Sequence, residues 1–270
     1  MQVLRMRDVQ NLADHRNIPL REAGIAGLRY PVTVLDRHNS LQSTVAEISM
    51  SVSLPHHYRG THMSRFIEVL EESGCVFQGS TIPALLGRLR KVLEAENARI
   101  RIAFPYFMER TAPVTGAAAK MVYSCVFHGE SSPEKEDFLL TVTVPVGTLC
   151  PCSREISSRG AHNQRGFVTL EVRTRQLPDG TSEIVWIEEL VELAEKSASS
   201  PLYTLLKRAD EKFVTEQAYG NPAFAEDIVR NAAEMLMDDP RVTGFRVRAE
   251  NHESIHGHNA YAVVAHGEGY

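Results

Sequence analysis

The sequence predicts an α+β protein in which antiparallel sheets are covered on one face by helices. Several segments alternate apolar and polar residues with period two, as half-buried strands do. Other segments repeat apolar residues at helical spacing. Polar stretches of hairpin length separate several of the strands. Groups of strands and groups of helices follow one another twice along the chain.

The first part of the chain predicts two strands and then two helices. Residues 28–34 and 48–54 alternate with period two, and the polar segment 36–43 between them predicts a hairpin connection. The segment 60–73, GTHMSRFIEVLEES, carries apolar residues on one helical face. A second helix with the same spacing is expected from residue 80 to residue 93.

Three further strands complete the first half. Residues 100–104 and 142–146 alternate clearly, and the apolar segment 115–127 predicts a strand between them. The run SSPEKED at 131–137 predicts a solvated turn or loop. Residues 148–166 follow directly after the last of these strands, where a rigid element can present binding residues.

The second half repeats this order without obvious sequence identity to the first. A strand at 168–172 is followed by a strong turn signal, PDG, at 178–180. Three helices and two closing strands are then expected. The helices are predicted at 186–194, from Ser200 to Phe213 and from Asn221 to Leu236, and the strands at 245–249 and 261–265.

Composition limits the class of protein. The chain of 270 residues is 43% hydrophobic and 23% charged, which is ordinary for a soluble globular protein. Its formal net charge of -5 argues against a general nucleic-acid binder, because no basic excess neutralises phosphates. The N-terminus has no signal-peptide pattern and no apolar run reaches 18 residues, so we expect a cytoplasmic protein with no membrane partner.

Metal-capable and proton-transfer side chains concentrate in TLCPCSREISSRGAHNQRG, residues 148–166, which is expected to be neither helix nor strand. Pro151 restricts Cys150 to extended geometry, so Cys150 and Cys152 are expected on a stiff, non-helical turn. With His162, these thiols could bind a transition metal or form a nucleophile and base. Inert buried thiols and a closed structural zinc site are the alternatives.

Three histidines lie in NHESIHGHN, the predicted turn between the two closing strands. His252, His256 and His258 could bind a metal or move protons, although exposed loop histidines often have no such role.

Charged residues also lie off the apolar faces of two predicted helices. Glu211 and Glu226 are carboxylates that could serve a site or could simply be solvated. Lys207 and Arg208 could hold phosphate or pair with acids.

Four motifs, taken together and in order, resemble the GTP cyclohydrolase type IB family. They are GTHMSRF, LCPCSREISSRGAHNQRG, LLKRADEKFVTEQAYGNPAFAEDIVR and ENHESIHGHNAYA, and the resemblance runs from about Asp8 to Ala265. It implies a tunnelling fold: one unit over 1–270, made of two tandem modules at approximately 25–150 and 151–270. It also implies a homotetramer with sites at subunit interfaces, and conversion of GTP and water to 7,8-dihydroneopterin triphosphate and formate, the first step of the folate pathway.

The resemblance also assigns roles to five residues. In the family the metal is held by positions that correspond to Cys150, His162 and Glu211, so Cys150 counts among the catalytic residues. The purine-anchoring glutamate corresponds to Glu226, and His256 is the position where proton transfer or metal contact is expected. Ala209 stands where proline is expected before the DEK motif, and the C-terminal tail runs slightly long; neither difference affects these positions.

The expected chemistry agrees with these residue types. A metal with an open position lowers the pKa of bound water to about 7, which provides a nucleophile for purine C8. Thiolate, imidazole and carboxylate together do not select zinc strongly over manganese or ferrous iron. A carboxylate at Glu226 could accept hydrogen bonds from the guanine N1–H and amino group.

Candidates for triphosphate contact are Arg65, Arg165, Lys207 and Arg208. The nearest rival is the NADPH-dependent nitrile reductase that shares the tunnelling fold, although its nucleotide-binding motif is not recognisable. A purine- or metal-binding oligomer without catalysis is the second rival.

Overall fold

The computed structural model describes residues 10, 12–177 and 182–270, which form two compact units. Unit 1 comprises the residues up to Ala103 together with Phe127–Phe138. Unit 2 comprises Phe104–Val126 and the remainder of the described chain from Leu139. Strands β4 (Ala98–Thr111), β5 (Ala118–Ser131) and β6 (Glu136–Leu149) each contribute residues to both units.

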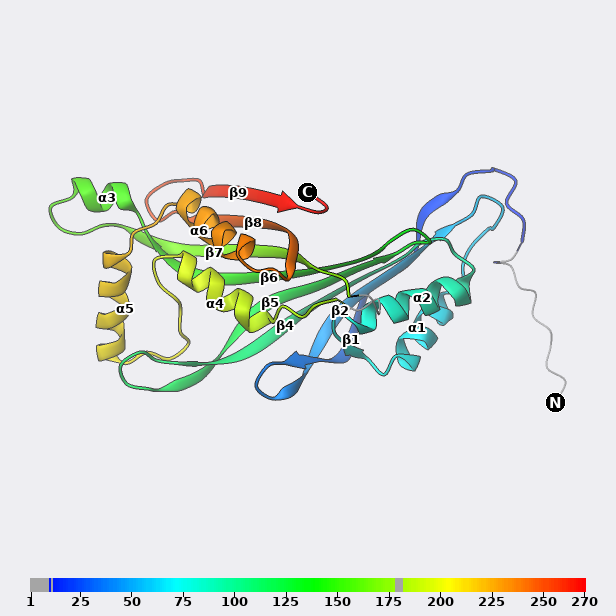
Figure 1. The fold of residues 1–270 in the computed structure, drawn as a ribbon, viewed down its shortest axis with the longest axis horizontal. Coiled ribbons are helices and arrows are strands. Elements are labelled where there is room, and N and C mark those ends of the chain that lie inside the picture. The colour runs from blue at the N-terminus through cyan, green and yellow to red at the C-terminus, as the bar shows by residue number, and fades with distance from the viewer. Residues whose placement is uncertain (1–9, 11, 178–181) are drawn as a thin grey trace. The chain divides into compact units, whose positions relative to one another are not determined.

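In the described part of the chain, nine strands pair in the order β3-β1-β2-β4-β5-β6-β7-β8-β9 (Figure 1). The pairs β1·β2, β2·β4, β6·β7, β7·β8 and β8·β9 are antiparallel, and the short β3 pairs in parallel with β1. The predicted α+β class is therefore confirmed. The division into tandem modules at residue 150 stays a prediction.

Unit 1 contains the predicted hairpin, β1 (Leu20–Asp36) and β2 (Ser40–Leu54). Asp36 closes its turn, because one carboxylate oxygen accepts hydrogen bonds from the backbone N–H groups of His38 and Asn39, each at 2.8 Å. The remaining elements of this unit are α1 (Met63–Glu72), β3 (Val76–Phe77) and α2 (Thr81–Leu93).

The two helices of unit 1 lie side by side, as predicted from their apolar faces (Figure 1). Alternate residues of the hairpin face the same core as these helices, which is the arrangement that period-two and helical spacing predict. Fully buried side chains of this core include Val34, Ile48, Phe66, Leu70 and Leu86.

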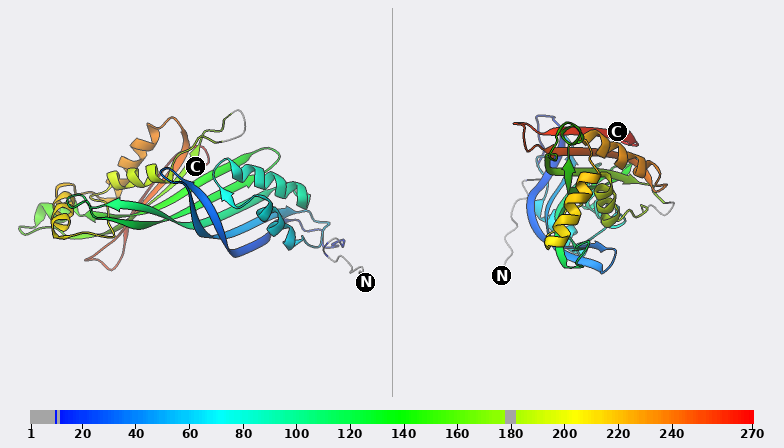
Figure 2. Two further views of the ribbon diagram at one scale, coloured as in Figure 1. Left: turned by 90° about the horizontal axis from the view of Figure 1, so that it is seen from below. Right: turned by 90° about the vertical axis from the view of Figure 1, so that its left-hand side faces the viewer.

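Unit 2 contains the elements that carry the predicted site. They are α3 (Pro151–Ile156), β7 (Asn163–Thr174), α4 (Ile187–Ser197), α5 (Arg208–Gly220), α6 (Ala225–Met237), β8 (Val242–His252) and β9 (Ala260–Gly267). Figure 2 shows α4 and α6 together over one face of the strands of this unit, and α6 contacts β8 and β9. Its buried core includes Val144, Val168, Leu190, Ile228 and Val247.

Two predictions about unit 2 are wrong. Pro151 begins the six-residue helix α3, so Cys152 is helical although Cys150 is extended as predicted. Proline suits the first position of a helix, where its missing N–H has no partner to lose. The helix expected from Ser200 begins only at Arg208, because Ser200 exchanges two backbone hydrogen bonds with Gly147, at 2.9 and 3.1 Å.

The predicted PDG turn at 178–180 lies outside the described residues. Among the residues that are described, each helix is either too short or too polar to cross a membrane.

Candidate functional site

Cys150 stands where β6 ends and α3 begins. Its backbone is extended, with φ -70° and ψ 119°, because the following proline disfavours helical geometry at this position. The Ser153 N–H donates a hydrogen bond to Cys150 Sγ at 3.4 Å, so the thiol caps the helix. This hydrogen bond fixes the position of the sulfur, the atom that would bind a metal or attack an electrophile.

His162 is joined to Cys150 across the loop by two backbone contacts. The Cys150 N–H donates to the His162 carbonyl oxygen at 3.2 Å. The His162 N–H donates to Ser153 Oγ at 3.1 Å. Ser153 therefore contacts both candidate ligands, and the backbones of Cys150 and His162 are hydrogen-bonded to each other across the loop.

The turn between β8 and β9 approaches His162 from the other side. Ser254 Oγ lies 3.3 Å from His162 Nδ1, a hydrogen bond that leaves Nε2 for another partner. The same turn carries His256 and His258, whose exposed rings stack with centroids 5.3 Å apart. The predicted proton-transfer residue His256 thus belongs to a turn that contacts the Cys150–His162 loop.

Glu211 lies in the first turn of α5 and is exposed. Its neighbour Asp210 is fully buried and accepts hydrogen bonds from the N–H groups of Val114 and Thr115 at 2.9 Å, from the Thr115 hydroxyl at 2.6 Å and from the Lys207 N–H at 3.0 Å. Burial raises the pKa of Asp210, but these hydrogen bonds outweigh it and hold the pKa below its usual range. Asp210 therefore anchors the helix end that carries Glu211.

A cation–π contact links α3 and α5. Arg154 of α3 lies over the ring of Tyr219 of α5, with the guanidinium carbon 4.9 Å from the ring centroid. Glu211 itself makes no side-chain contact with Cys150 or His162, and within the described ranges no three His, Cys, Asp or Glu side chains cluster closely enough to hold a metal. The ligand set of Cys150, His162 and Glu211 therefore stays a prediction.

Glu226 is exposed in the first turn of α6. The segment before this helix is joined to the end of β6, since the Ala223 N–H donates to the Leu149 carbonyl oxygen at 3.2 Å. Leu149 immediately precedes Cys150. The predicted purine anchor is therefore tied through the backbone to the same strand end as the thiol.

The four predicted triphosphate contacts fall in different places. Arg165 is exposed on β7, and Lys207 and Arg208 are exposed where α5 begins. Arg65 belongs to unit 1, and its Nη1 donates to the Val92 carbonyl oxygen at 3.0 Å. Their contact with triphosphate stays a prediction.

The donor chemistry fits a divalent transition metal. Cys150 offers a sulfur with a hydrogen-bond donor beside it, and His162 offers a ring nitrogen whose orientation is set by Ser254. The prediction from sequence missed Ser153, Ser254 and Asp210. Ser153 and Asp210 each occupy the third position of a helix, where capping interactions are common, and that position is the local signal for both residues.

Comparison with known proteins identifies sequence relatives over almost the whole chain. The model of the family described as type I GTP cyclohydrolase folE2 matches residues 6–262. GTP cyclohydrolase FolE2 of Syntrophus aciditrophicus is 51% identical over 259 residues, which cover 96% of this chain and 99% of the relative. The protein of the same name from Thermosipho melanesiensis is 52% identical over 259 residues, with 96% and 97% covered.

Solved structures with a similar fold are far more distant in sequence. Uricase from Arthrobacter globiformis aligns with a TM-score of 0.52 at 9% identity, covering 92% of this chain and 94% of that one. A highly active mutant of Bacillus sp. TB-90 urate oxidase gives a TM-score of 0.52 at 8% identity, covering 92% and 100%. At such identity the similarity concerns the fold alone.

Proposed function

The chain belongs to the type I GTP cyclohydrolase FolE2 family, and from that premise we propose that Cys150, His162 and Glu211 hold the divalent metal of its reaction. The chain is a GTP cyclohydrolase I of folate biosynthesis, and GTP is its substrate. The observation that carries the metal proposal is the joined pair Cys150 and His162, with Ser153 hydrogen-bonded to both.

Each of the three residues offers a donor suited to zinc, manganese or ferrous iron. When bound, such a metal supplies the Lewis acidity that makes water nucleophilic near neutral pH, which attack at purine C8 requires. The Ser153 N–H positions the Cys150 sulfur, and Ser254 orients the His162 ring. Glu211 completes the set when α5 brings its carboxylate to this pair.

Two other side chains are proposed to act on the purine. Glu226 accepts hydrogen bonds from the guanine N1–H and amino group, and so selects against adenine, whose edge presents a different pattern. His256 moves a proton during ring opening and release of formate, a role that suits an imidazole in an exposed turn beside His162.

The remaining parts of the proposal concern the triphosphate and the assembly. Arg165, Lys207 and Arg208 are free of acidic partners in the described chain and are available for phosphate oxygens. The proposed enzyme is a cytoplasmic homotetramer with active sites at its subunit interfaces. Each chain has a tunnelling fold made of two tandem modules. Exposed apolar side chains near the site, such as Ile156 and Ile255, are compatible with burial against another subunit.

Formate release tests the metal proposal directly. Chelator-stripped protein is reloaded separately with zinc, manganese and ferrous iron and assayed with GTP, with Cys150→Ala alongside. We expect metal-dependent formate from the wild-type protein and none from the variant, together with loss of one bound metal per chain. Full activity of stripped protein, or a variant that keeps both metal and activity, would overturn the proposed ligand set.

A further inference from the structure

A buried segment of unit 2, residues 197–200, lies beside the end of β6, directly before Cys150. It begins with the last residue of α4, and each of its residues is at most 3% exposed. Three of these residues are serines, so three hydroxyl groups are held out of water at one place. Buried hydroxyl groups normally have hydrogen-bond partners, and those partners indicate what the segment holds in place.

The end of β6 offers backbone groups to this segment. Because the Cys150 N–H donates to the His162 carbonyl oxygen, the preceding residue, Leu149, is a position whose own N–H and carbonyl point away from β7. The Leu149 N–H donates instead to Ser199 Oγ, at 3.0 Å, and both residues are buried. The Ser199 hydroxyl therefore holds the peptide group that directly precedes the one joining Leu149 to Cys150.

A glycine lets the segment come this close to β6. Gly147, two residues before Leu149, exchanges backbone hydrogen bonds with Ser200 at 2.9 and 3.1 Å. A Cβ atom at Gly147 would lie 2.5 Å from Ser200 Oγ, which is closer than nonbonded atoms approach. This backbone pairing therefore sets the distance at which the Ser199 hydroxyl meets Leu149.

Two asparagine side chains hold the segment from neighbouring helices. Asn231 of α6 donates through Nδ2 to the Ser197 carbonyl oxygen at 3.3 Å. Asn221, the residue that ends α5, donates through Nδ2 to the Ala198 carbonyl oxygen at 3.1 Å. Carbonyl groups at the end of a helix lack intrahelical partners, and these two amides supply them. Ser199 is thus presented by a segment that α5 and α6 keep in place.

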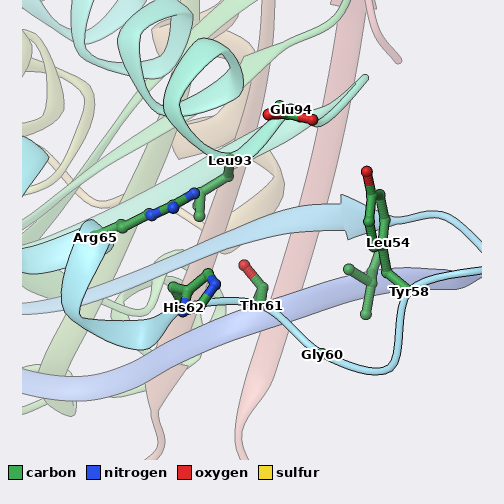
Figure 3. Close-up of a pocket in the computed structure, with 8 residues that line it drawn as sticks. All are labelled: Leu54, Tyr58, Gly60, Thr61, His62, Arg65, Leu93 and Glu94. Carbon is green, nitrogen blue, oxygen red and sulfur yellow. The ribbon is translucent and has the colours of Figure 1, made fainter. Parts of the chain in front are cut away.

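Hydrogen bonds from a side chain to the end of a helix also occur in unit 1. Figure 3 shows Arg65 of α1 extending toward the end of α2, where its Nη1 donates to the Val92 carbonyl oxygen at 3.0 Å. That contact joins two helices, as the amides of Asn221 and Asn231 do in unit 2. The Ser199 contact is of another kind, because its hydroxyl accepts from the backbone of a strand next to a predicted metal ligand.

Contacts within the loop set Cys150 relative to His162, whereas the Ser199 contact holds the strand end from which the loop starts. We propose that Ser199 is a positioning residue for the reaction: its hydroxyl fixes the Leu149 N–H and thereby places Cys150 relative to the residues that α5 and α6 carry. The effect on turnover rests on the proposed function of Cys150, whereas the restraint on the thiol is measurable without metal.

Ser197 shows what a role in stability alone would look like. It is buried to a similar degree, but its hydroxyl donates to the Leu193 carbonyl oxygen within α4, at 2.8 Å. Ser197→Ala and Ser199→Ala each remove one buried hydrogen bond, and both should lower the stability of unit 2. A positioning role predicts in addition that only Ser199→Ala alters the behaviour of Cys150.

Alkylation by iodoacetamide of the full-length, chelator-stripped protein tests the restraint on the thiol, with each cysteine read by tandem mass spectrometry of peptides. We expect Ser199→Ala to raise the rate at Cys150 by about fivefold, because an unsatisfied Leu149 N–H releases the strand end. Ser197→Ala should leave that rate unchanged. Cys125 of β5, 1% exposed within unit 2, reports unfolding and should stay protected in both variants.

Turnover of GTP by the metal-loaded protein tests the consequence for the reaction. Ser199→Ala should lower kcat for formate release by about tenfold with little change in KM, because a misplaced ligand acts on the chemical step. Ser199→Thr keeps the hydroxyl and should recover kcat to within about threefold of wild type. Ser197→Ala should have a kcat near that of the wild type.

Three results would overturn the positioning role: an unchanged alkylation rate at Cys150 in Ser199→Ala, equal rises in Ser199→Ala and Ser197→Ala, or labelling of Cys125 alongside Cys150. A Ser199→Thr variant as slow in turnover as Ser199→Ala, with Cys125 still protected, would overturn it as well. Faster alkylation of Cys150 without any loss of kcat would instead overturn the proposed function of Cys150 and leave Ser199 as the residue that restrains it. The two failures are therefore distinguishable.

Discussion

The predicted metal ligands at the start of α3 and in α5 are held in different ways. At α3, Cys150 and His162 are fixed by short-range contacts with each other and with Ser153, all within one loop. At α5, Glu211 is exposed, and the helix end is fixed by the buried Asp210, which contacts residues almost a hundred positions earlier. One half of the site is thus organised locally, and the other half depends on tertiary anchoring.

The largest expected effect concerns the locally organised half. Cys150→Ser retains the size of the side chain but replaces a thiolate by a neutral hydroxyl, a much poorer ligand for these metals. We expect formate release to fall by about a thousandfold, with loss of bound metal measured by atomic absorption.

The matched control for this variant is Cys152→Ser. Cys152 is exposed and lies in α3, two residues after Cys150. Its thiol has no hydrogen-bond partner in the described chain. Its substitution should change activity by no more than a few fold. If the two variants lose activity equally, the result would contradict a metal-ligand role that belongs to Cys150 and not to Cys152.

The second prediction addresses the other half. Glu211→Gln keeps the shape of an exposed side chain and removes its charge, so the helix should remain folded. We expect activity to fall by about a hundredfold and metal affinity to fall in parallel, because an amide is a weak replacement for a carboxylate ligand.

Glu216 provides the comparison on the same helix. It is also exposed and forms only an i,i+4 ion pair with Lys212 at 3.1 Å. Glu216→Gln should leave activity and metal content near wild type and change stability very little. If Glu211→Gln and Glu216→Gln have equal activity and equal metal content, Glu211 is not a metal ligand.

The third prediction concerns the anchor rather than a ligand. In Asp210→Asn an amide NH₂ must face the donors of Thr115 and Lys207, so hydrogen bonds are replaced by donor–donor contacts. We expect the melting temperature at pH 7 to fall by about 5 °C. Asp227→Asn is the control, since Asp227 occupies the same helix position in α6 but accepts only the Phe224 N–H in its cap, and it should lose less.

The same anchor predicts a pH dependence. Because the pKa of Asp210 is lowered in the folded state, its stabilisation is complete above the unfolded pKa of about 4 and is lost as pH falls toward the folded pKa. The difference in melting temperature between wild type and Asp210→Asn should therefore be constant near neutral pH and narrow below about pH 4. A difference that widens on acidification would contradict this account.

The same contrast between local and tertiary organisation explains what the sequence could predict. Strands such as 28–34 and 168–172 were predictable because one face of each is buried, which imposes period two. The extended geometry of Cys150 was predictable from Pro151 alone. The later start of α5 was not, because Ser200 is held outside the helix by its backbone pairing with Gly147, more than fifty residues earlier.

Contacts within the candidate site also depend on tertiary structure that local sequence does not predict. The motifs indicated which residue types belong to it, but the contact of Ser254 with His162 depends on the pairing of β7 with β8, in which Gly166 lies opposite Asn251. No local pattern contains that register. The position of Glu211 relative to Cys150 likewise depends on how α5 packs.

The smallest expected effect concerns the cation–π contact between α3 and α5. Arg154 lies over the ring of Tyr219, and Figure 1 shows α3 and α5 at the same end of unit 2. A cation–π contact of this exposure contributes about 0.5–1 kcal/mol. A double-mutant cycle with Arg154→Met and Tyr219→Leu, measured by urea unfolding, should give a coupling energy of that size.

This cycle also separates a stabilising contact from a positioning one. If Arg154 and Tyr219 align Glu211 with the Cys150–His162 pair, each single variant should weaken metal binding by a few fold. The metal affinity of the double variant should then be no lower than that of the single variant that binds metal less tightly. If the contact contributes only to stability, the unfolding midpoint moves while metal affinity does not. The second result would mean that α5 is positioned by Asp210 alone, and that the locally organised half of the site does not depend on the other half for its alignment.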